Sequence, residues 1–124
     1  MDLDDAKLAA RTRADALVVS NHGGRQLDGA PSSISALPKI ADAVSQEIEV
    51  MFDGGIRSGQ DVLRALALGA KGCLIGRPYI FGLGAAGEAG VAKAIEIIRR
   101  ELDVSMALTG VKSVRKIDGQ ILAS

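Results

Sequence analysis

The stretch Ala16-Leu17-Val18-Val19-Ser20-Asn21-His22-Gly23-Gly24-Arg25 passes from a continuous apolar run into polar residues and glycines. A short apolar run that ends in this way is typical of a parallel strand buried on both faces. The same change recurs at Glu49-Val50-Met51-Phe52-Asp53-Gly54-Gly55 and at Gly72-Cys73-Leu74-Ile75-Gly76. The sequence therefore predicts three strands, over residues 16–20, 49–53 and 72–76.

Helices are predicted before, between and after these strands. Residues 3–13 favour a helix, with Asp4 placed to cap it. Apolar residues at helical spacing and a glycine suited to a helix end predict the other helices, over residues 34–44, 61–68, 78–83 and 88–108. The alternation of helices and strands implies right-handed parallel units.

Two α/β architectures accommodate this order: a doubly wound sheet, and part of a TIM (β/α)₈ barrel. Three strands cannot close a barrel, and a complete one typically takes about 250 residues. If the chain has the barrel fold, it therefore supplies only part of a barrel. Its 124 residues match one ordinary domain, residues 1–124, and the 48% of apolar residues are enough for a core.

Composition narrows the setting and the partners. Acidic and basic residues balance at 15 each, which gives no electrostatic case for nucleic acid or an anionic membrane. The single cysteine, Cys73, excludes a disulfide framework within one chain and lies in a strand, so we expect a core residue. No apolar stretch approaches the ~20 residues of a membrane helix, and the acidic start is unlike a secretory signal. We expect a cytoplasmic protein, and the sequence has no Cys/His metal cluster.

Polar residues gather directly after each predicted strand. Residues 20–22 follow the first strand, residues 53–57 the second and residues 76–78 the third. The carboxyl ends of parallel strands are where both candidate architectures place ligands. We therefore expect these residues to share one site.

The second and third groups are suited to a phosphate. Gly54 and Gly55 let the backbone approach a ligand closely, and Arg57 and Arg77 supply forked cationic donors. The N-terminus of the predicted short helix, residues 78–83, would add a favourable dipole. The alternative is that the glycines only make tight turns and the arginines pair with surface acids.

His22 and Arg25 suggest chemistry beside that phosphate site. His22 is the only histidine in the chain and can remove a proton near neutral pH. Arg25 can bind a substrate carboxylate through two parallel hydrogen bonds. The alternative is that His22 is a loop residue that caps a neighbouring element.

Three segments of the chain resemble segments of a known enzyme family. The run Ser20-Asn21-His22-Gly23-Gly24-Arg25-Gln26-Leu27-Asp28 resembles the active-site signature of the FMN-dependent α-hydroxy-acid oxidases and dehydrogenases, which include glycolate oxidase, lactate oxidase, L-lactate dehydrogenase and mandelate dehydrogenase. Asp53-Gly54-Gly55-Ile56-Arg57 and Gly76-Arg77-Pro78-Tyr79 are similar to two further segments of that family. The resemblance covers nearly the whole chain, in order.

The resemblance implies the last three strands of a (β/α)₈ barrel, with FMN as cofactor. It implies that His22 is the catalytic base in contact with substrate and that Arg25 binds the substrate carboxylate. It implies a flavin site made of Ser20, Asp53, Gly54, Gly55, Ile56, Arg57, Gly76 and Arg77. The reaction would oxidise an L-2-hydroxy acid to a 2-oxo acid and pass electrons to oxygen, a quinone or a cytochrome. Full-length members are commonly homo-oligomers.

Several active-site residues of the family have no counterpart in this chain. The family's flavin-proximal Lys, the Asp that supports the catalytic His, and the substrate-binding Tyr residues lie in the N-terminal part of the barrel and have no counterpart here. A histidine base without its carboxylate loses orientation and stabilisation of the imidazolium. We therefore expect little or no turnover from this chain alone. Two alternatives are another phosphate-binding barrel enzyme, such as an FMN-dependent isomerase, and a non-catalytic assembly module.

Overall fold

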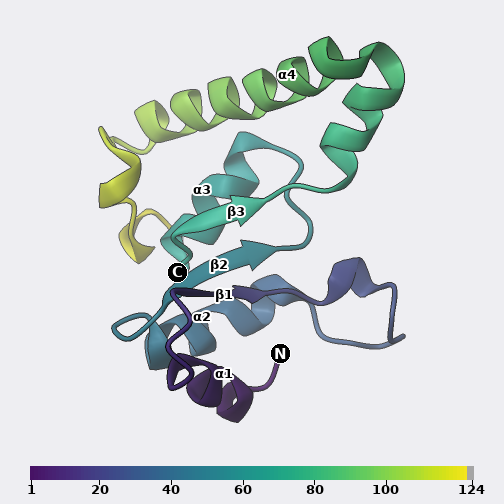
Figure 1. The fold of residues 1–124 in the computed structure, drawn as a ribbon. Helices are drawn as coiled ribbons and strands as arrows, with labels where there is room; N and C mark the ends of the chain where they lie inside the picture. Colours follow the sequence, from purple (N-terminus) through teal and green to yellow (C-terminus); the bar gives the residue numbers. More distant parts are fainter. Residues whose placement is uncertain (123–124) are drawn as a thin grey trace.

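A computed structural model describes residues 1–122 and contains a parallel sheet of three strands in the order β1-β2-β3 (Figure 1). The strands are β1 (Ala16–Val19), β2 (Glu49–Asp53) and β3 (Gly72–Leu74). Their register aligns Val19 with Phe52 and Phe52 with Cys73. The three predicted strands and their parallel pairing are confirmed.

Four helices alternate with the strands in the described part of the chain: α1 (Leu3–Ala10), α2 (Ser33–Val44), α3 (Gly59–Ala67) and α4 (Arg77–Leu108). The predicted cap of the first helix was wrong. Asp2 caps α1, because its carboxylate accepts hydrogen bonds from the backbone N–H groups of Asp4 and Asp5. None of the helices in residues 1–122 has the length and apolarity needed to cross a bilayer.

Strands β1 and β3 are shorter than the sequence predicted. The predicted ends were Ser20 and Gly76, but β1 ends at Val19 and β3 at Leu74. Gly76 instead occupies the N-cap position of α4, with φ −112° and ψ −91°. The strand ends are therefore released from the sheet to begin the loops that build the site.

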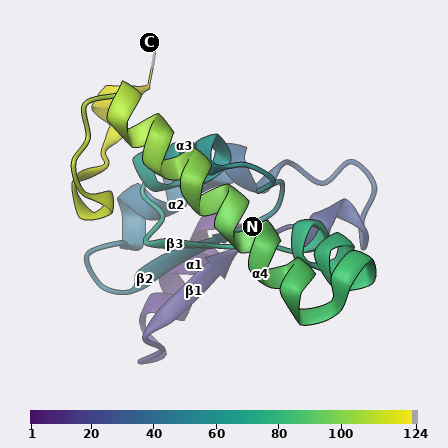
Figure 2. The same ribbon diagram turned by 90° about the horizontal axis from the view of Figure 1, so that it is seen from above.

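The long helix α4 is interrupted, as the two separate predicted helices indicated. Ala86 and Gly87 leave helical dihedral angles, and Gly87 has φ 57°. A Cβ built on Gly82 would lie 2.5 Å from the carbonyl oxygen of Gly90, so the two arms of α4 are in backbone contact there. The chain turns back at the interruption, and the longer arm passes over α3 (Figures 1 and 2). The tail forms two short 3₁₀ turns, Val114–Lys116 and Gly119–Ile121.

The core lies on one face of the sheet, beneath α2 and α3. Val50 and Phe52 on β2 are almost fully buried, as are Leu37 and Val44 on α2. The opposite face of the sheet is open within residues 1–122. Because side chains alternate along a strand, the residues between the core positions point to that face. Val18, which is 48% exposed, and Leu74, which is 43% exposed, belong to that open face.

The open face predicts association with a second polypeptide or a second copy of the chain. An uncovered apolar sheet face between two unpaired strand edges favours such contacts. We expect the isolated chain to elute above its monomer mass of 12.8 kDa in sizing chromatography with light scattering. Val18→Lys should shift the population toward monomer and leave the helical circular dichroism unchanged. A sharp monomer peak for the unaltered chain would contradict this expectation.

Candidate functional site

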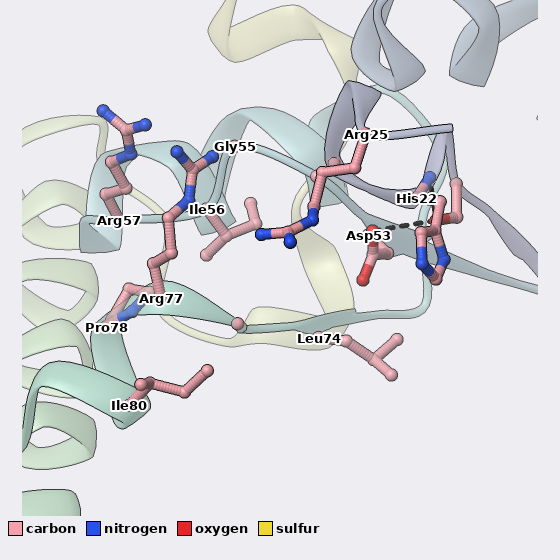
Figure 3. Close-up of a pocket in the computed structure, with 14 residues that line it drawn as sticks. His22, Arg25, Asp53, Gly55, Ile56, Arg57, Leu74, Arg77, Pro78 and Ile80 are labelled. Atoms are coloured by element: carbon pink, nitrogen blue, oxygen red, sulfur yellow. Dashed lines mark hydrogen bonds between the residues drawn. The ribbon is translucent and has the colours of Figure 1, made fainter. Parts of the chain in front are cut away.

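A pocket of about 450 Å³ lies at the carboxyl ends of the three strands (Figure 3). The structure brings all ten of the predicted site residues to it: Ser20, His22, Arg25, Asp53, Gly54, Gly55, Ile56, Arg57, Gly76 and Arg77. Each of the three strand-end loops contributes to the wall. These residues therefore share one pocket at this edge of the sheet.

The loop after β1 is held by a chain of hydrogen bonds that starts on β2. The Ser20 hydroxyl donates to Oδ1 of Asp53 at 2.8 Å and accepts from the backbone N–H of His22 at 3.1 Å. His22 has φ 55°, a left-handed conformation that is uncommon outside glycine. The imidazole of His22 makes no hydrogen bond within residues 1–122. Ser20 and Asp53 thus fix the backbone of His22 and leave its ring free in the pocket.

The loop after β2 requires glycine at its first turn. Gly54 has φ 111°, and a Cβ there would lie 2.3 Å from the hydroxyl oxygen of the buried Ser33. Gly55, with φ 86°, has open space where its Cβ would be. Ile56 belongs to the buried core, so its side chain anchors the loop. The chain after β2 is consequently packed on one side and open to the pocket on the other.

Two helices begin at this edge of the sheet, and their N-termini differ. The first turn of α3 is closed, because Ser58 and Asp61 form a capping box and Asp61 also accepts from the Arg57 backbone N–H at 3.1 Å. The first turn of α4 has no side-chain cap, and its N-cap Gly76 and first residue Arg77 line the pocket. A helix N-terminus attracts anions. The α4 N-terminus is therefore the uncapped one of the two, and it lies where the sequence predicted the start of a short helix.

Three guanidinium groups line the pocket without an acidic partner. The ion pairs of residues 1–122 involve Lys7, Arg64, Lys93, Arg99 and Arg100, and none involves Arg25, Arg57 or Arg77. The alternative in which the pocket arginines pair with surface acids was therefore wrong for the described residues. Figure 3 draws His22 and Asp53 toward one end of the pocket and Arg57 and Arg77 toward the other, with Arg25 reaching in between.

The pocket wall also contains residues that the sequence prediction did not include in the site. Gly23, Leu74, Pro78 and Ile80 line it, and Leu74 and Ile80 are exposed apolar side chains. Leu74 was predicted as a strand residue, and nothing in a short apolar run tells which face of its strand is covered. Cys73, on the other face, packs against the core, and burial raises the pKa of its thiol to about 11. A thiol with that pKa is protonated at neutral pH and is a poor nucleophile.

The fold and this pocket define an α/β protein with an arginine-lined pocket at the carboxyl ends of parallel strands. The chain belongs to the FMN-dependent dehydrogenase family, whose model matches residues 1–124. It is 58% identical over 123 residues to an L-lactate dehydrogenase of Caulobacter vibrioides, with 99% of this chain and 32% of that protein covered. An L-lactate dehydrogenase of Pectobacterium atrosepticum is 53% identical over 122 residues, with 98% and 32% covered.

A solved structure of a mandelate oxidase is also similar to this chain. Mandelate oxidase with benzoyl-formic acid superposes with a TM-score of 0.92 at 48% identity, over 96% of this chain and 36% of that one. This likeness selects the (β/α)₈ barrel over the doubly wound sheet, and the three strands with their helices form part of such a barrel. The chain spans about a third of the length of the curated relatives it matches, since 32% of each is covered.

Replacing Ser20 tests the hydrogen-bond chain from β2 to His22. Ser20→Ala removes the link to Asp53 and the acceptor for the His22 N–H, so we expect faster exchange of the His22 amide and a loss of about 1 kcal/mol in the free energy of unfolding. Ser20→Thr keeps the hydroxyl and should stay close to the unaltered chain. Amide exchange followed by NMR and urea denaturation measure the two effects. Equal exchange rates in the Ala and Thr variants would contradict the assignment.

Proposed function

We propose that residues 1–124 are the C-terminal segment of an FMN-dependent barrel enzyme that oxidises an L-2-hydroxy acid to a 2-oxo acid. The observation that carries this proposal is the convergence on a single strand-end pocket of one histidine and three guanidinium groups that have no acidic partner within residues 1–122. The names of the relatives, L-lactate dehydrogenase and mandelate oxidase, support the class of substrate. Family membership disfavours an unrelated phosphate-binding barrel.

The residues of the pocket fit the flavin phosphate. At this end of the pocket, Arg57 and Arg77 have no acidic partner within residues 1–122. The backbone at Gly55 is open, and the α4 N-terminus behind Gly76 has no side-chain cap. The backbone N–H of Arg57 already donates to Asp61, so Arg57 would bind the phosphate through its guanidinium. Ser20, Asp53, Gly54 and the backbone of Ile56 would border the rest of the cofactor. FMN, when bound, supplies the acceptor for the two electrons that leave the substrate.

His22 and Arg25 would act on the hydroxy acid at the other end of the pocket. The guanidinium of Arg25 is suited to bind the substrate carboxylate through two parallel hydrogen bonds. The free imidazole of His22, on a backbone fixed by Ser20, would accept a proton from the bound substrate. Oxygen, a quinone or a cytochrome would then collect the electrons, and a cytoplasmic homo-oligomer is the expected form of the whole protein.

Efficient turnover would need more than this chain. Within residues 1–122 no carboxylate orients the His22 imidazole, and the pocket has walls from three strand-end loops only. A general base that lacks an orienting partner loses much of its catalytic effect. We therefore propose that the activity depends on other parts of the barrel.

Replacement of Arg57 or Arg77, the two phosphate-end arginines of the pocket, tests the cofactor assignment. We expect the chain to bind FMN more tightly than riboflavin, because only FMN has the phosphate. Arg57→Ala and Arg77→Ala should each weaken FMN binding about tenfold or more, the scale of one charged hydrogen bond, without changing riboflavin binding. Arg99→Ala, on the exposed part of α4, is the matched control. Fluorescence titration measures all of these constants, and an unchanged ratio of FMN to riboflavin affinity would contradict the phosphate site.

The second test concerns the reaction. With FMN bound and oxygen removed, L-lactate, glycolate or L-mandelate should bleach the flavin band of the isolated chain slowly or not at all. Any slow bleaching should disappear in His22→Gln, and its half-saturating substrate concentration should rise in Arg25→Ala. Rapid bleaching by the chain alone would show that the activity does not depend on other parts of the barrel. Bleaching that persists in His22→Gln would contradict the role of His22.

A further inference from the structure

We infer that Glu101, on the longer arm of α4, is a positioning residue for the phosphate loop, defined as residues 54–57. This inference rests on the proposed function. Oε2 of Glu101 accepts a hydrogen bond from the backbone N–H of Gly59 at 2.9 Å, across a separation of 42 residues. Gly59 is the first residue of α3, two positions after the phosphate loop ends. Glu101 lies outside the pocket and would act only through this contact.

The contact is built into the backbone of both helices. A Cβ on the buried Gly59 would lie 2.0 Å from the backbone nitrogen of Leu102 and 2.3 Å from the carbonyl carbon of Glu101. No other residue type would allow α4 to approach this closely. One turn further on, the buried Ser105 donates its hydroxyl to the Glu101 carbonyl at 2.7 Å, and Met106 is buried beside it. The side chain of Glu101 therefore extends from a fixed position on α4 to the first turn of α3.

The first turn of α3 passes this restraint to the phosphate loop. Oδ2 of Asp61 accepts from the backbone N–H groups of Arg57 at 3.1 Å and Ser58 at 3.0 Å, and the Ser58 hydroxyl accepts from the Asp61 N–H at 3.2 Å. Residues 57–61 consequently behave as one hydrogen-bonded unit, held by Glu101 on its α4 side. Arg77 begins the shorter arm of α4, and that arm contacts the longer arm at Gly82 and Gly90. The Glu101 contact therefore ties the Arg57 unit to the longer arm, against which the arm that carries Arg77 packs.

The charge of Glu101 has an effect of opposite sign, which allows a clean test. A carboxylate at the α3 N-terminus lowers the attraction of that end for a phosphate. Loss of charge alone would therefore tighten FMN binding slightly, whereas loss of position would weaken it. Glu101→Gln removes the charge and keeps an acceptor for Gly59, while Glu101→Ala removes both.

The experiment compares FMN and riboflavin affinities of the unaltered chain with those of Glu101→Ala, Glu101→Gln and Asp103→Ala. Asp103 is an exposed carboxylate two residues further along the same helix and is the matched control. We expect Glu101→Ala to weaken FMN binding about fivefold, within the range of one ordinary hydrogen bond, and to leave riboflavin binding unchanged. Glu101→Gln should bind FMN slightly more tightly than the unaltered chain, and Asp103→Ala should bind it equally well.

Three results would overturn the inference: an unchanged FMN affinity in Glu101→Ala, an equal loss for FMN and riboflavin, or a loss in Glu101→Gln as large as in Glu101→Ala. Exchange of the Gly59 amide, expected to be faster only in Glu101→Ala, reports the contact without any ligand. If the unaltered chain does not prefer FMN to riboflavin, the proposed function fails and the positioning role fails with it. If that preference is present and Gly59 exchange is the same in all variants, only the Glu101 inference is wrong.

Discussion

The parallel pairing of β1, β2 and β3 in one register is the constraint on which the rest of this structure depends. Because the strands run in the same direction, three loops from distant parts of the sequence start from the same edge. The Ser20–Asp53 hydrogen bond joins the first two of them just beyond the last paired residues. If β1 paired in the opposite direction, His22 and Arg25 would lie at the other edge, away from the arginines of the second and third loops.

Charge and backbone geometry act together at that edge. Three guanidinium groups without acidic partners in residues 1–122 repel one another, and with Asp53 as the one carboxylate among the lining residues the excess positive charge favours an anion in the pocket. Glycine at position 54 lets the second loop pack against Ser33. Asp61 caps α3, which leaves the uncapped start of α4 as the available helix N-terminus. Under the proposed function, the phosphate and the substrate carboxylate would therefore bind at different ends of one pocket.

Much of this was predictable from the sequence, because its signals are local. An apolar run followed by Ser20, Asp53 or Gly76 marks a strand end, and a parallel sheet collects such ends. The contacts that set the geometry are not local. Nothing in the sequence indicates that Glu101 reaches Gly59, or that Leu74 faces an open side of the sheet. The helix caps were harder to predict from the sequence than the helices for the same reason. Asp2 and Asp4 are the same residue type, and only the folded backbone shows which of them caps α1.

Phosphorus NMR of FMN titrated with this chain tests the phosphate site most directly. If Arg57 and Arg77 bind the phosphate, its resonance should shift and broaden as the complex forms, and both effects should be lost in the Arg57→Ala, Arg77→Ala double variant. A flavin whose ring absorption changes on binding while its phosphate resonance stays at the free position would contradict the assignment of this strand-end pocket to the FMN phosphate.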